Sequence, residues 1–200
     1  LNASDFSSFL LQAQGSKAPV IVLANATSDT VNTIKAANEF GITQGGQKLA
    51  ALLFTIAEVN GLGQETAQGL NLTESFYWNM DDQTRDFGKR FFERTGAMPS
   101  DLQAGVYSSL IHYFKAVAAS DSDKGTTVVA RMREIPIRDP IVRNARLRED
   151  GRMVHDIYLL EVKKPGDIRE PWDYLRVLRT IPGEQAFSPL SASACPLLAR

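Results

Sequence analysis

The sequence is poor in the side chains that build disulfides and metal centres. It contains one cysteine, Cys195, and two histidines, His112 and His155. One cysteine excludes a disulfide framework within the chain and any zinc site made of several thiolates. No apolar run reaches 18 residues, so no segment predicts a transmembrane helix. The 22 basic and 23 acidic side chains give a net charge of −1, which excludes a basic field over the whole chain for nucleic acid.

What is present is an ordinary globular composition. Of the 200 residues, 44% are hydrophobic and 22% are charged, which argues against wholesale disorder. A chain of this length makes one or two compact units and can bury a sizeable core. The composition therefore favours a folded protein and leaves the function to be found in local patterns.

The first third alternates between helical and strand patterns. Apolar residues at helical spacing begin at Phe6, and residues 19–23 form a short β-branched run typical of a buried parallel strand. A second helix carries Val31, Ile34 and Ala37, and residues 49–56 predict the next buried strand. This order of helix, strand, helix and strand indicates a βαβ layer.

The middle third is mainly helical. Residues 70–78 predict a long strand that ends in aromatic residues, and Ser100 with Gln103 predicts a capping box at the start of a long helix. We expect that helix to bury an apolar stripe: Leu102, Val106, Leu110, Tyr113 or Phe114, and Val117. A shorter helix over residues 123–133 is expected to turn Val128, Val129 and Met132 inward.

The final third changes character. Residues 141–147 and 153–162 flank an Asp-Gly turn and predict a β-hairpin. Residues 174–181 predict another strand, and the Pro- and Ser-rich residues 182–200 predict an irregular tail over the surface.

No catalytic motif is complete. The glycines near residue 61 fail the dinucleotide fingerprint, and no phosphate loop or nucleophile elbow is present. His155 and Asp156 are adjacent on a predicted strand, so they point to opposite faces and form no couple there. Asp81 and Asp82 are interpreted as a helix N-cap in preference to a catalytic acid pair. We therefore expect no catalytic residue, no metal and no cofactor.

Seven arginines lie between residues 131 and 152, with four acids among them. A phosphate or nucleic-acid patch is one interpretation of this cluster. Interleaved ion pairs on a solvated hairpin are the favoured one, because the acids alternate with the arginines. Docking of a protein partner at this cluster stays open.

Two loops follow predicted parallel strands, where open α/β sheets place their ligands. Residues 25–28 supply short polar side chains and a helix N-terminus suited to a carboxylate, and residues 57–60 supply Glu58 for a cation or hydroxyl. Capping and turn formation alone would also explain both loops. Tyr77 and Trp78 suit stacking on a small organic ligand or, alternatively, core packing.

At this point the sequence resembles a known family. Four stretches carry the likeness: residues 21–42 (IVLANATSDTVNTIKAANEFGI), 69–78 (GLNLTESFYW), 98–118 (MPSDLQAGVYSSLIHYFKAVA) and 148–173 (REDGRMVHDIYLLEVKKPGDIREPWD). In order and spacing they are similar to the C-terminal half of type I periplasmic substrate-binding proteins of ABC importers, in the branch that binds branched-chain amino acids and aromatic acids.

The resemblance implies an α/β fold with a parallel βαβ second lobe and part of the first lobe, joined by strand crossovers. It implies a second-lobe βαβ region over residues 1–72 and first-lobe helices and a hairpin over residues 73–160. Residues 161–200 would form a crossing strand and a tail that packs on the second lobe. The chain is then expected to be a fragment, whose exposed apolar surface invites a dimer.

The resemblance also implies site residues. Asn25 and Thr27 match the second-lobe ligand loop, and Glu58 matches the acid that holds an ammonium group. Tyr77 would lie in the crossing segment near the ligand, and Gln103 would begin the helix that faces it.

The implied function is solute capture in the periplasm. The ligand would be a small amino acid or aromatic carboxylate, delivered to an ABC permease by a hinge closure that binding favours. A ligand-sensing domain of a signalling receptor or regulator with the same fold is the alternative. A small α/β enzyme is the third hypothesis.

Overall fold

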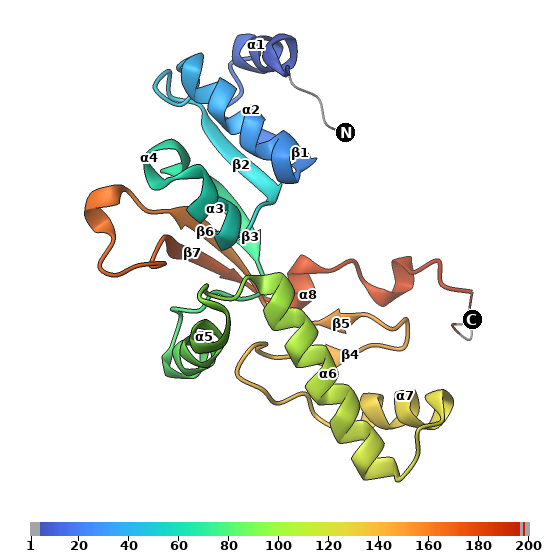
Figure 1. The fold of residues 1–200 in the computed structure, drawn as a ribbon. Helices are drawn as coiled ribbons and strands as arrows, with labels where there is room; N and C mark the ends of the chain where they lie inside the picture. The colour runs from blue at the N-terminus through green and yellow to red at the C-terminus, as the bar shows by residue number, and fades with distance from the viewer. Residues whose placement is uncertain (1–4, 197, 199–200) are drawn as a thin grey trace. The chain divides into compact units, whose positions relative to one another are not determined.

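The computed structural model describes residues 5–196 and 198, and its contacts divide the chain into two units (Figure 1). Unit 1 comprises Leu1–Glu74, Thr95–Met98 and Leu159–Arg179. Unit 2 comprises Ser75–Arg94, Pro99–Tyr158 and Thr180–Arg200. The chain therefore passes between the units several times, and each unit is assembled from segments far apart in the sequence.

Unit 1 is built on a five-stranded sheet in the order β1-β2-β3-β6-β7. Its strands are β1 (Val20–Ala26), β2 (Lys48–Leu53), β3 (Asn71–Glu74), β6 (Ile157–Val162) and β7 (Leu175–Ile181). β1 runs parallel to β2, and β2 runs parallel to β3, with Val20 opposite Lys48 and Ala51 opposite Leu72. The predicted parallel βαβ layer is confirmed.

Four helices accompany this sheet: α1 (Ser7–Gly15), α2 (Thr27–Glu39), α3 (Ile56–Leu62) and α4 (Gln64–Ala67). A short 3-10 turn, η1 (Pro165–Asp167), follows β6. α2 contacts β1 and packs beside α3 and α4 (Figure 1). Its buried Ile34 and Ala37 meet a core that includes Leu23 and Leu49, so the helix covers one face of the sheet.

Two strand ends differ from the prediction. β2 ends at Leu53 rather than at residue 56, because Thr55 caps the start of α3. β3 ends at Glu74, so the long strand predicted over residues 70–78 is wrong. Tyr77 and Trp78 follow the strand in a segment that is not paired in a sheet. Both side chains are buried, so their apolar pattern reflects burial and not a strand.

Unit 2 holds the longer helices and a small hairpin. The helices are α5 (Asp82–Thr95), α6 (Asp101–Ser120) and α7 (Gly125–Glu134), with the short α8 (Gly183–Ala186) and the 3-10 turn η2 (Leu190–Ala192) in the tail. β4 (Arg146–Leu147) and β5 (Met153–Val154) pair antiparallel. The capping box predicted at Ser100 and Gln103 is present and starts α6.

The predicted burial of α6 is wrong. Its apolar stripe is exposed, with Leu102 at 67% and Val106 at 61% of full exposure, and Leu110 and Phe114 follow. The buried face instead carries small or polar residues: Ala104, Ser108, His112 and Ala116. These side chains recur every four residues, and the small ones let the neighbouring elements approach closely, because they occupy little volume. On α7, Val128 is buried as predicted, whereas Val129 is exposed.

Hydrogen bonds join α6 to its neighbours within unit 2. The Nε2 atom of His112 lies 2.8 Å from the carbonyl oxygen of Met132 at the end of α7. The Ser108 hydroxyl donates to Oδ2 of Asp139 at 2.7 Å. The buried face of α6 therefore contacts its neighbours through polar side chains as well as small ones. Apolar periodicity alone selected the wrong face, because it takes no account of such side chains.

The hairpin is shorter than predicted, because β4 and β5 pair over only two residues each. His155 and Asp156 interrupt the strand predicted over residues 153–162, which becomes β5 and β6. The Asp156 carboxylate there accepts hydrogen bonds from the Asn144 side chain at 2.8 Å and from the Gly183 backbone N–H at 3.3 Å. Through these two hydrogen bonds, Asp156 links the tail to the segment that leads into the hairpin.

Residues 159–179 group with unit 1, whereas the described part of the tail from Thr180 onward groups with unit 2. The Arg146 guanidinium pairs with Glu184, and Arg148 donates to the Ser188 carbonyl at 2.7 Å. A Cβ on Gly183 would lie 2.8 Å from the His155 carbonyl oxygen. The tail follows the hairpin because its polar groups are bound there.

We expect Ile34→Ala to destabilise unit 1 by about 2–5 kcal/mol, because the side chain is fully buried between α2 and the sheet. Leu52→Ala, at an exposed position on β2, should stay within about 0.5 kcal/mol of the original chain. Urea unfolding followed by far-UV circular dichroism measures both. Equal losses would contradict this assignment of the core.

A second prediction concerns the turn of the hairpin. Arg148 donates to both carboxylate oxygens of Asp150, at 3.0 and 2.5 Å, and lowers the pKa of Asp150 from 3.8 to about 2. Since the folded state has the lower pKa, the carboxylate stabilises the fold above about pH 4, and that contribution is lost as the pH falls toward 2. An NMR titration should give a midpoint near 2, and Arg148→Gln should return it toward 3.8. A midpoint that ignores the substitution would refute the ion pair.

Candidate functional site

The junction of β1 and α2 holds a hydrogen-bonded polar cluster at the carboxyl end of a parallel strand. The side-chain N–H of Asn25 donates to the Thr33 hydroxyl at 2.9 Å, and Thr30 donates to Oδ1 of Asn25 at 3.0 Å. The Thr33 hydroxyl donates in turn to the Asp29 carbonyl at 2.7 Å. The buried Thr30 and Thr33 therefore hold the Asn25 amide in one orientation and tie the strand end to the first turns of the helix.

Thr27 occupies an unusual backbone conformation at this junction. Its φ is 53°, in the left-handed region, where a β-branched side chain is strained. Thr27 and Ser28 are both exposed at the N-terminus of α2, where backbone N–H groups have no partner within the helix. The turn therefore presents two hydroxyls and free amides, a combination suited to a carboxylate.

Asp29 follows in the same turn and was not among the predicted site residues. It is only 7% exposed, and its Oδ1 accepts no hydrogen bond from the described residues. A carboxylate at a helix N-terminus is favourable, because the amide dipoles point toward it. The sequence at this turn suggested only a helix cap. The burial of Asp29 is what marks it as a candidate, and burial depends on the tertiary structure.

The second predicted loop has a structural role. The Glu58 side chain accepts a hydrogen bond from the backbone N–H of Thr55 at 2.6 Å, and the Thr55 side chain completes a capping box at α3. One oxygen of the acid expected to hold an ammonium group is thus already engaged. Glu58 is in unit 1 with Asn25 and Thr27, but on a different helix.

The two remaining predicted residues belong to unit 2. Tyr77 is buried and packs edge-on against Trp78 with ring centroids 6.1 Å apart. The Gln103 Oε1 accepts from the backbone N–H of Ser100 at 2.7 Å and from its hydroxyl at 2.6 Å. Core packing and helix capping account for the contacts seen at these two positions.

The other sequence candidates also have structural partners. Asp81 caps α5 by accepting from the Thr84 N–H at 2.9 Å, which confirms the N-cap interpretation. It also pairs with Arg143 at 2.6 Å. Within the arginine cluster, Arg131 pairs with Glu134 and Arg148 pairs with Asp150, as the interleaved-pair interpretation predicted. Arg146 pairs with Glu184, which lies outside the cluster.

The described residues offer neither a metal site nor a membrane span. No group of three or more His, Cys, Asp and Glu side chains there is placed to hold a metal ion. Among the described helices, none combines the length and the apolar character that a membrane span requires.

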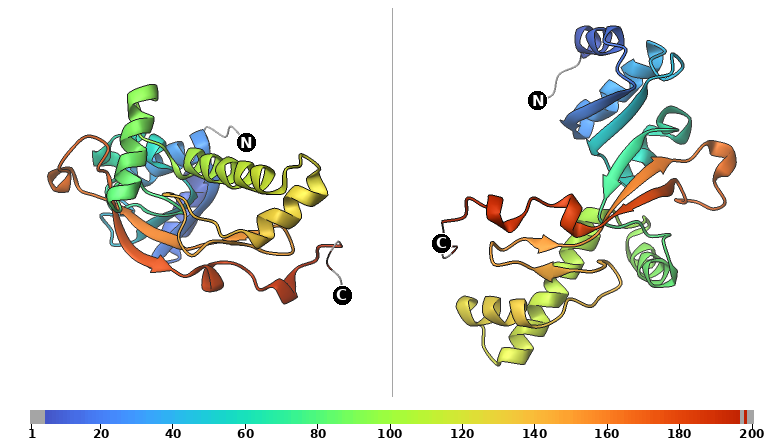
Figure 2. Two further views of the ribbon diagram at one scale, coloured as in Figure 1. Left: turned by 90° about the horizontal axis from the view of Figure 1, so that it is seen from below. Right: turned by 180° about the vertical axis from the view of Figure 1, so that it is seen from behind.

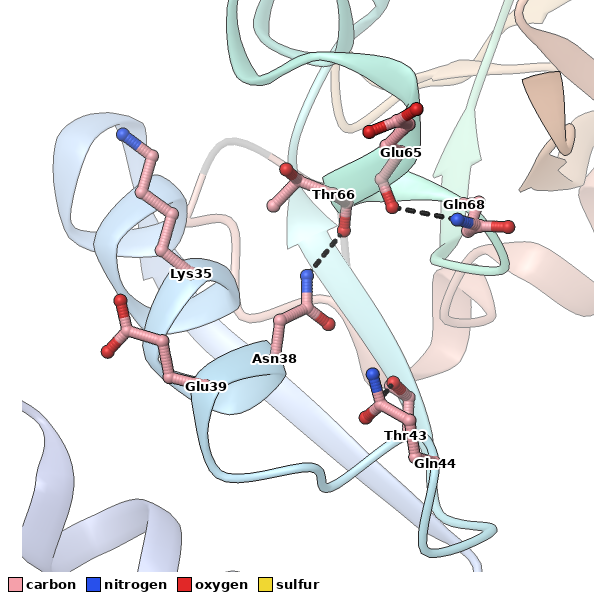
Figure 3. A pocket seen from close by; sticks show the side chains of 8 residues that line it. All are labelled: Lys35, Asn38, Glu39, Thr43, Gln44, Glu65, Thr66 and Gln68. Atoms are coloured by element: carbon pink, nitrogen blue, oxygen red, sulfur yellow. Dashed lines mark hydrogen bonds between the residues drawn. The ribbon is translucent and has the colours of Figure 1, made fainter.

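A polar hollow of about 730 Å³ lies at the opposite end of α2 (Figure 3). Its side chains come from the end of α2, from the loop that follows, and from α4: Lys35, Asn38, Glu39, Thr43, Gln44, Glu65, Thr66 and Gln68. The Asn38 amide donates to the Thr66 carbonyl at 2.7 Å, and Gln68 donates to the Glu65 carbonyl at 2.9 Å. Because these polar groups bond to the local backbone, and the hollow is far along α2 from the strand ends, we assign it no ligand.

A family model described as periplasmic binding protein matches residues 1–167. A solved periplasmic binding protein from Burkholderia mallei is 53% identical, with a TM-score of 0.90, and this chain covers 52% of its length with 99% of its own. None of the curated proteins matches.

Two further structures are similar. A branched-chain amino acid ABC transporter periplasmic ligand-binding protein from Burkholderia xenovorans is 43% identical, with a TM-score of 0.90, over 98% of this chain and 52% of that one. A solute-binding protein of an ABC transporter from Rhodopseudomonas palustris, solved with 3,4-dihydroxybenzoic acid, is 17% identical, with a TM-score of 0.74, over 90% and 49%. This chain thus spans about half the length of each.

The strained turn gives a direct prediction. Thr27→Gly should stabilise the protein by about 1 kcal/mol, because glycine adopts positive φ without the cost that a side chain carries. Ser28→Gly, one residue later and inside the helix, should destabilise it by about the same amount. Thermal unfolding of the two variants beside the original chain provides the measurement. If both changes destabilise equally, Thr27 is not strained.

Proposed function

This chain belongs to the family of periplasmic binding proteins, and on that premise we propose that it forms a βαβ second lobe and part of the first lobe in a solute-capture protein for an ABC importer. The match over residues 1–167 and the 53% identity to the Burkholderia mallei protein support the family. The chain spans about half of that relative. Solute capture, the permease partner and the periplasmic location are therefore proposed for this chain and not taken over from the relative.

The observation that carries the proposal is the β1–α2 junction. It lies at the carboxyl end of a parallel strand, where α/β sheets bind their ligands. Asn25 is fixed by Thr30 and Thr33, so its remaining N–H keeps one direction. With the exposed hydroxyls of Thr27 and Ser28, this gives a preorganised set of donors for a carboxylate.

Asp29 would have a role in binding an amino acid but not in binding an aromatic carboxylate. A buried acceptor with an unused oxygen suits the ammonium group of an amino acid, a role that Glu58 serves less well because its carboxylate caps α3. An aromatic carboxylate has no ammonium group and would need only the donors at Asn25, Thr27 and Ser28. Rearrangement of the strained turn at Thr27 would open a path to the Asp29 oxygen.

We expect ligand binding in a fusion of this chain with the part of the Burkholderia mallei protein that it does not cover. The fusion would be screened by thermal shift against aliphatic amino acids and against benzoate-like acids. Ligand at 100 times its dissociation constant should add about 2.7 kcal/mol to the stability, enough for a clear shift. The unfused chain tests whether one half binds alone.

A matched variant separates the ligand classes. Asp29→Asn keeps the side-chain shape and removes the charge, so it should weaken amino acid binding and spare benzoate-like acids. Leu178→Ala, exposed on β7 at the opposite edge of the sheet from β1, serves as the control. A fusion that binds neither class would contradict the proposed solutes, and binding untouched by Asn25→Ala, Thr27→Gly and Asp29→Asn would contradict the site.

A further inference from the structure

Asn25 lies where β1 departs from its regular pairing with β2. The register is regular as far as Leu23, and the next pair, Ala26 with Leu53, is shifted. Such an irregularity redirects the side chain that it carries. α2 runs back beside β1, so its first turns lie against this end of the strand (Figure 2). The Asn25 amide therefore bonds to side chains of the helix, Thr30 and Thr33.

The hydrogen bond between Asn25 and Thr33 has a fixed direction. The Thr33 Oγ1 atom lies 2.7 Å from the Asp29 carbonyl oxygen and 2.9 Å from the Asn25 Nδ2 atom. A carbonyl oxygen only accepts, so the single hydroxyl proton of Thr33 is committed to Asp29. The Thr33 oxygen is then left to accept, and the Asn25 amide has to turn its NH₂ group toward it.

The hydrogen bond between Asn25 and Thr30 has no such constraint. The Thr30 hydroxyl donates to the Asn25 Oδ1 atom at 3.0 Å, which is its one side-chain hydrogen bond among the described residues. A hydroxyl rotates freely, so it can accept from the NH₂ group of a reversed amide equally well. Thr30 thus stabilises either orientation of the amide, and Thr33 selects one of them.

Burial makes this selection costly to violate. Thr30 is 0% exposed and Thr33 is 4% exposed, so water does not replace their hydrogen bonds. A reversed amide would place the Asn25 oxygen against the Thr33 oxygen with no proton between them, which leaves two buried acceptors unpaired. Valine has the shape of threonine, so packing alone does not require a hydroxyl at position 33. The hydroxyl keeps Asn25 as a donor.

Resting on the proposed function, we propose that Thr33 is a positioning residue that makes the site favour a carboxylate over the corresponding carboxamide. A carboxylate offers only acceptors to the second N–H of Asn25 and to the hydroxyls of Thr27 and Ser28. A carboxamide has an NH₂ group in place of one oxygen. With Asn25 fixed as a donor, that NH₂ group meets another donor and stays unpaired, which lowers the affinity.

NMR on the 200-residue chain measures the orientation without any ligand. The side-chain NH₂ protons of Asn25 should give a stronger nuclear Overhauser effect to the Thr33 methyl group than to the Thr30 methyl group. In Thr33→Val the preference should be lost, because the amide is free to reverse. A stronger effect to Thr30 in the original chain would overturn the assigned direction.

Selectivity is measured on the fusion with the uncovered part of the Burkholderia mallei protein. Calorimetry compares two matched pairs of probes, leucine with leucinamide and benzoate with benzamide. For the acid that binds, Thr33→Val should lower the ratio of acid affinity to amide affinity about tenfold, because the reversed amide accepts from the carboxamide. Thr33→Ser keeps the hydroxyl and should keep the ratio.

Thr30→Val is the matched control. It removes a hydroxyl that is equally buried, on the same helix and bonded to the same asparagine. It should destabilise the fusion in urea as Thr33→Val does, yet leave the affinity ratio unchanged, since Thr33 still holds the amide. A purely structural role predicts that both valine variants change the ratio alike or that neither does, and either result would refute the proposal.

Asn25→Asp keeps the proposal testable if Thr33→Val does not fold. An aspartate has no NH₂ group in either orientation, so it should reverse the preference toward the carboxamide probe. An unchanged preference for the acid would show that Asn25 does not face the carboxylate.

The proposed function and this inference fail in different ways. A fusion that binds none of the four probes would overturn the proposed function and the selectivity with it, while the NMR experiment still decides the orientation. A fusion that binds an acid with the same ratio in the original and in Thr33→Val would overturn the role of Thr33 alone.

Discussion

The parallel pairing of β1 with β2 is the constraint on which unit 1 depends. Its register sets Val20 opposite Lys48, so both strands finish at the same edge of the sheet. That edge is where α2 begins, and the polar side chains of Asn25, Thr30 and Thr33 meet there. The candidate ligand site is therefore a consequence of this register.

Helix capping competes with ligand binding for the same residue types. Glu58 and Gln103 were interpreted as ligand residues, and both side chains accept hydrogen bonds from backbone N–H groups at helix starts. A short polar side chain after a strand can serve either purpose, because the chemistry of the two bonds is the same. Asn25 differs in that other side chains hold it, which leaves part of its amide for another partner.

Large apolar side chains are exposed on elements of both units. The exposed stripe of α6 and the open face of β1 and β2 follow the periodicities that normally mark a core. Exposure of these faces does not contradict the helical and strand patterns that predicted the elements.

The sequence by itself determined the alternation of helices and strands, the parallel layer, the capping box at Ser100, the N-cap at Asp81, and the family. These rest on local periodicity and on side chains within four residues of each other, which the chain order already fixes. Tertiary structure decided which face of α6 is buried, where β3 ends and where the tail packs. It also isolated the Asp29 oxygen and strained Thr27. Those outcomes depend on neighbours far along the chain, whose volume and hydrogen bonds no local pattern records.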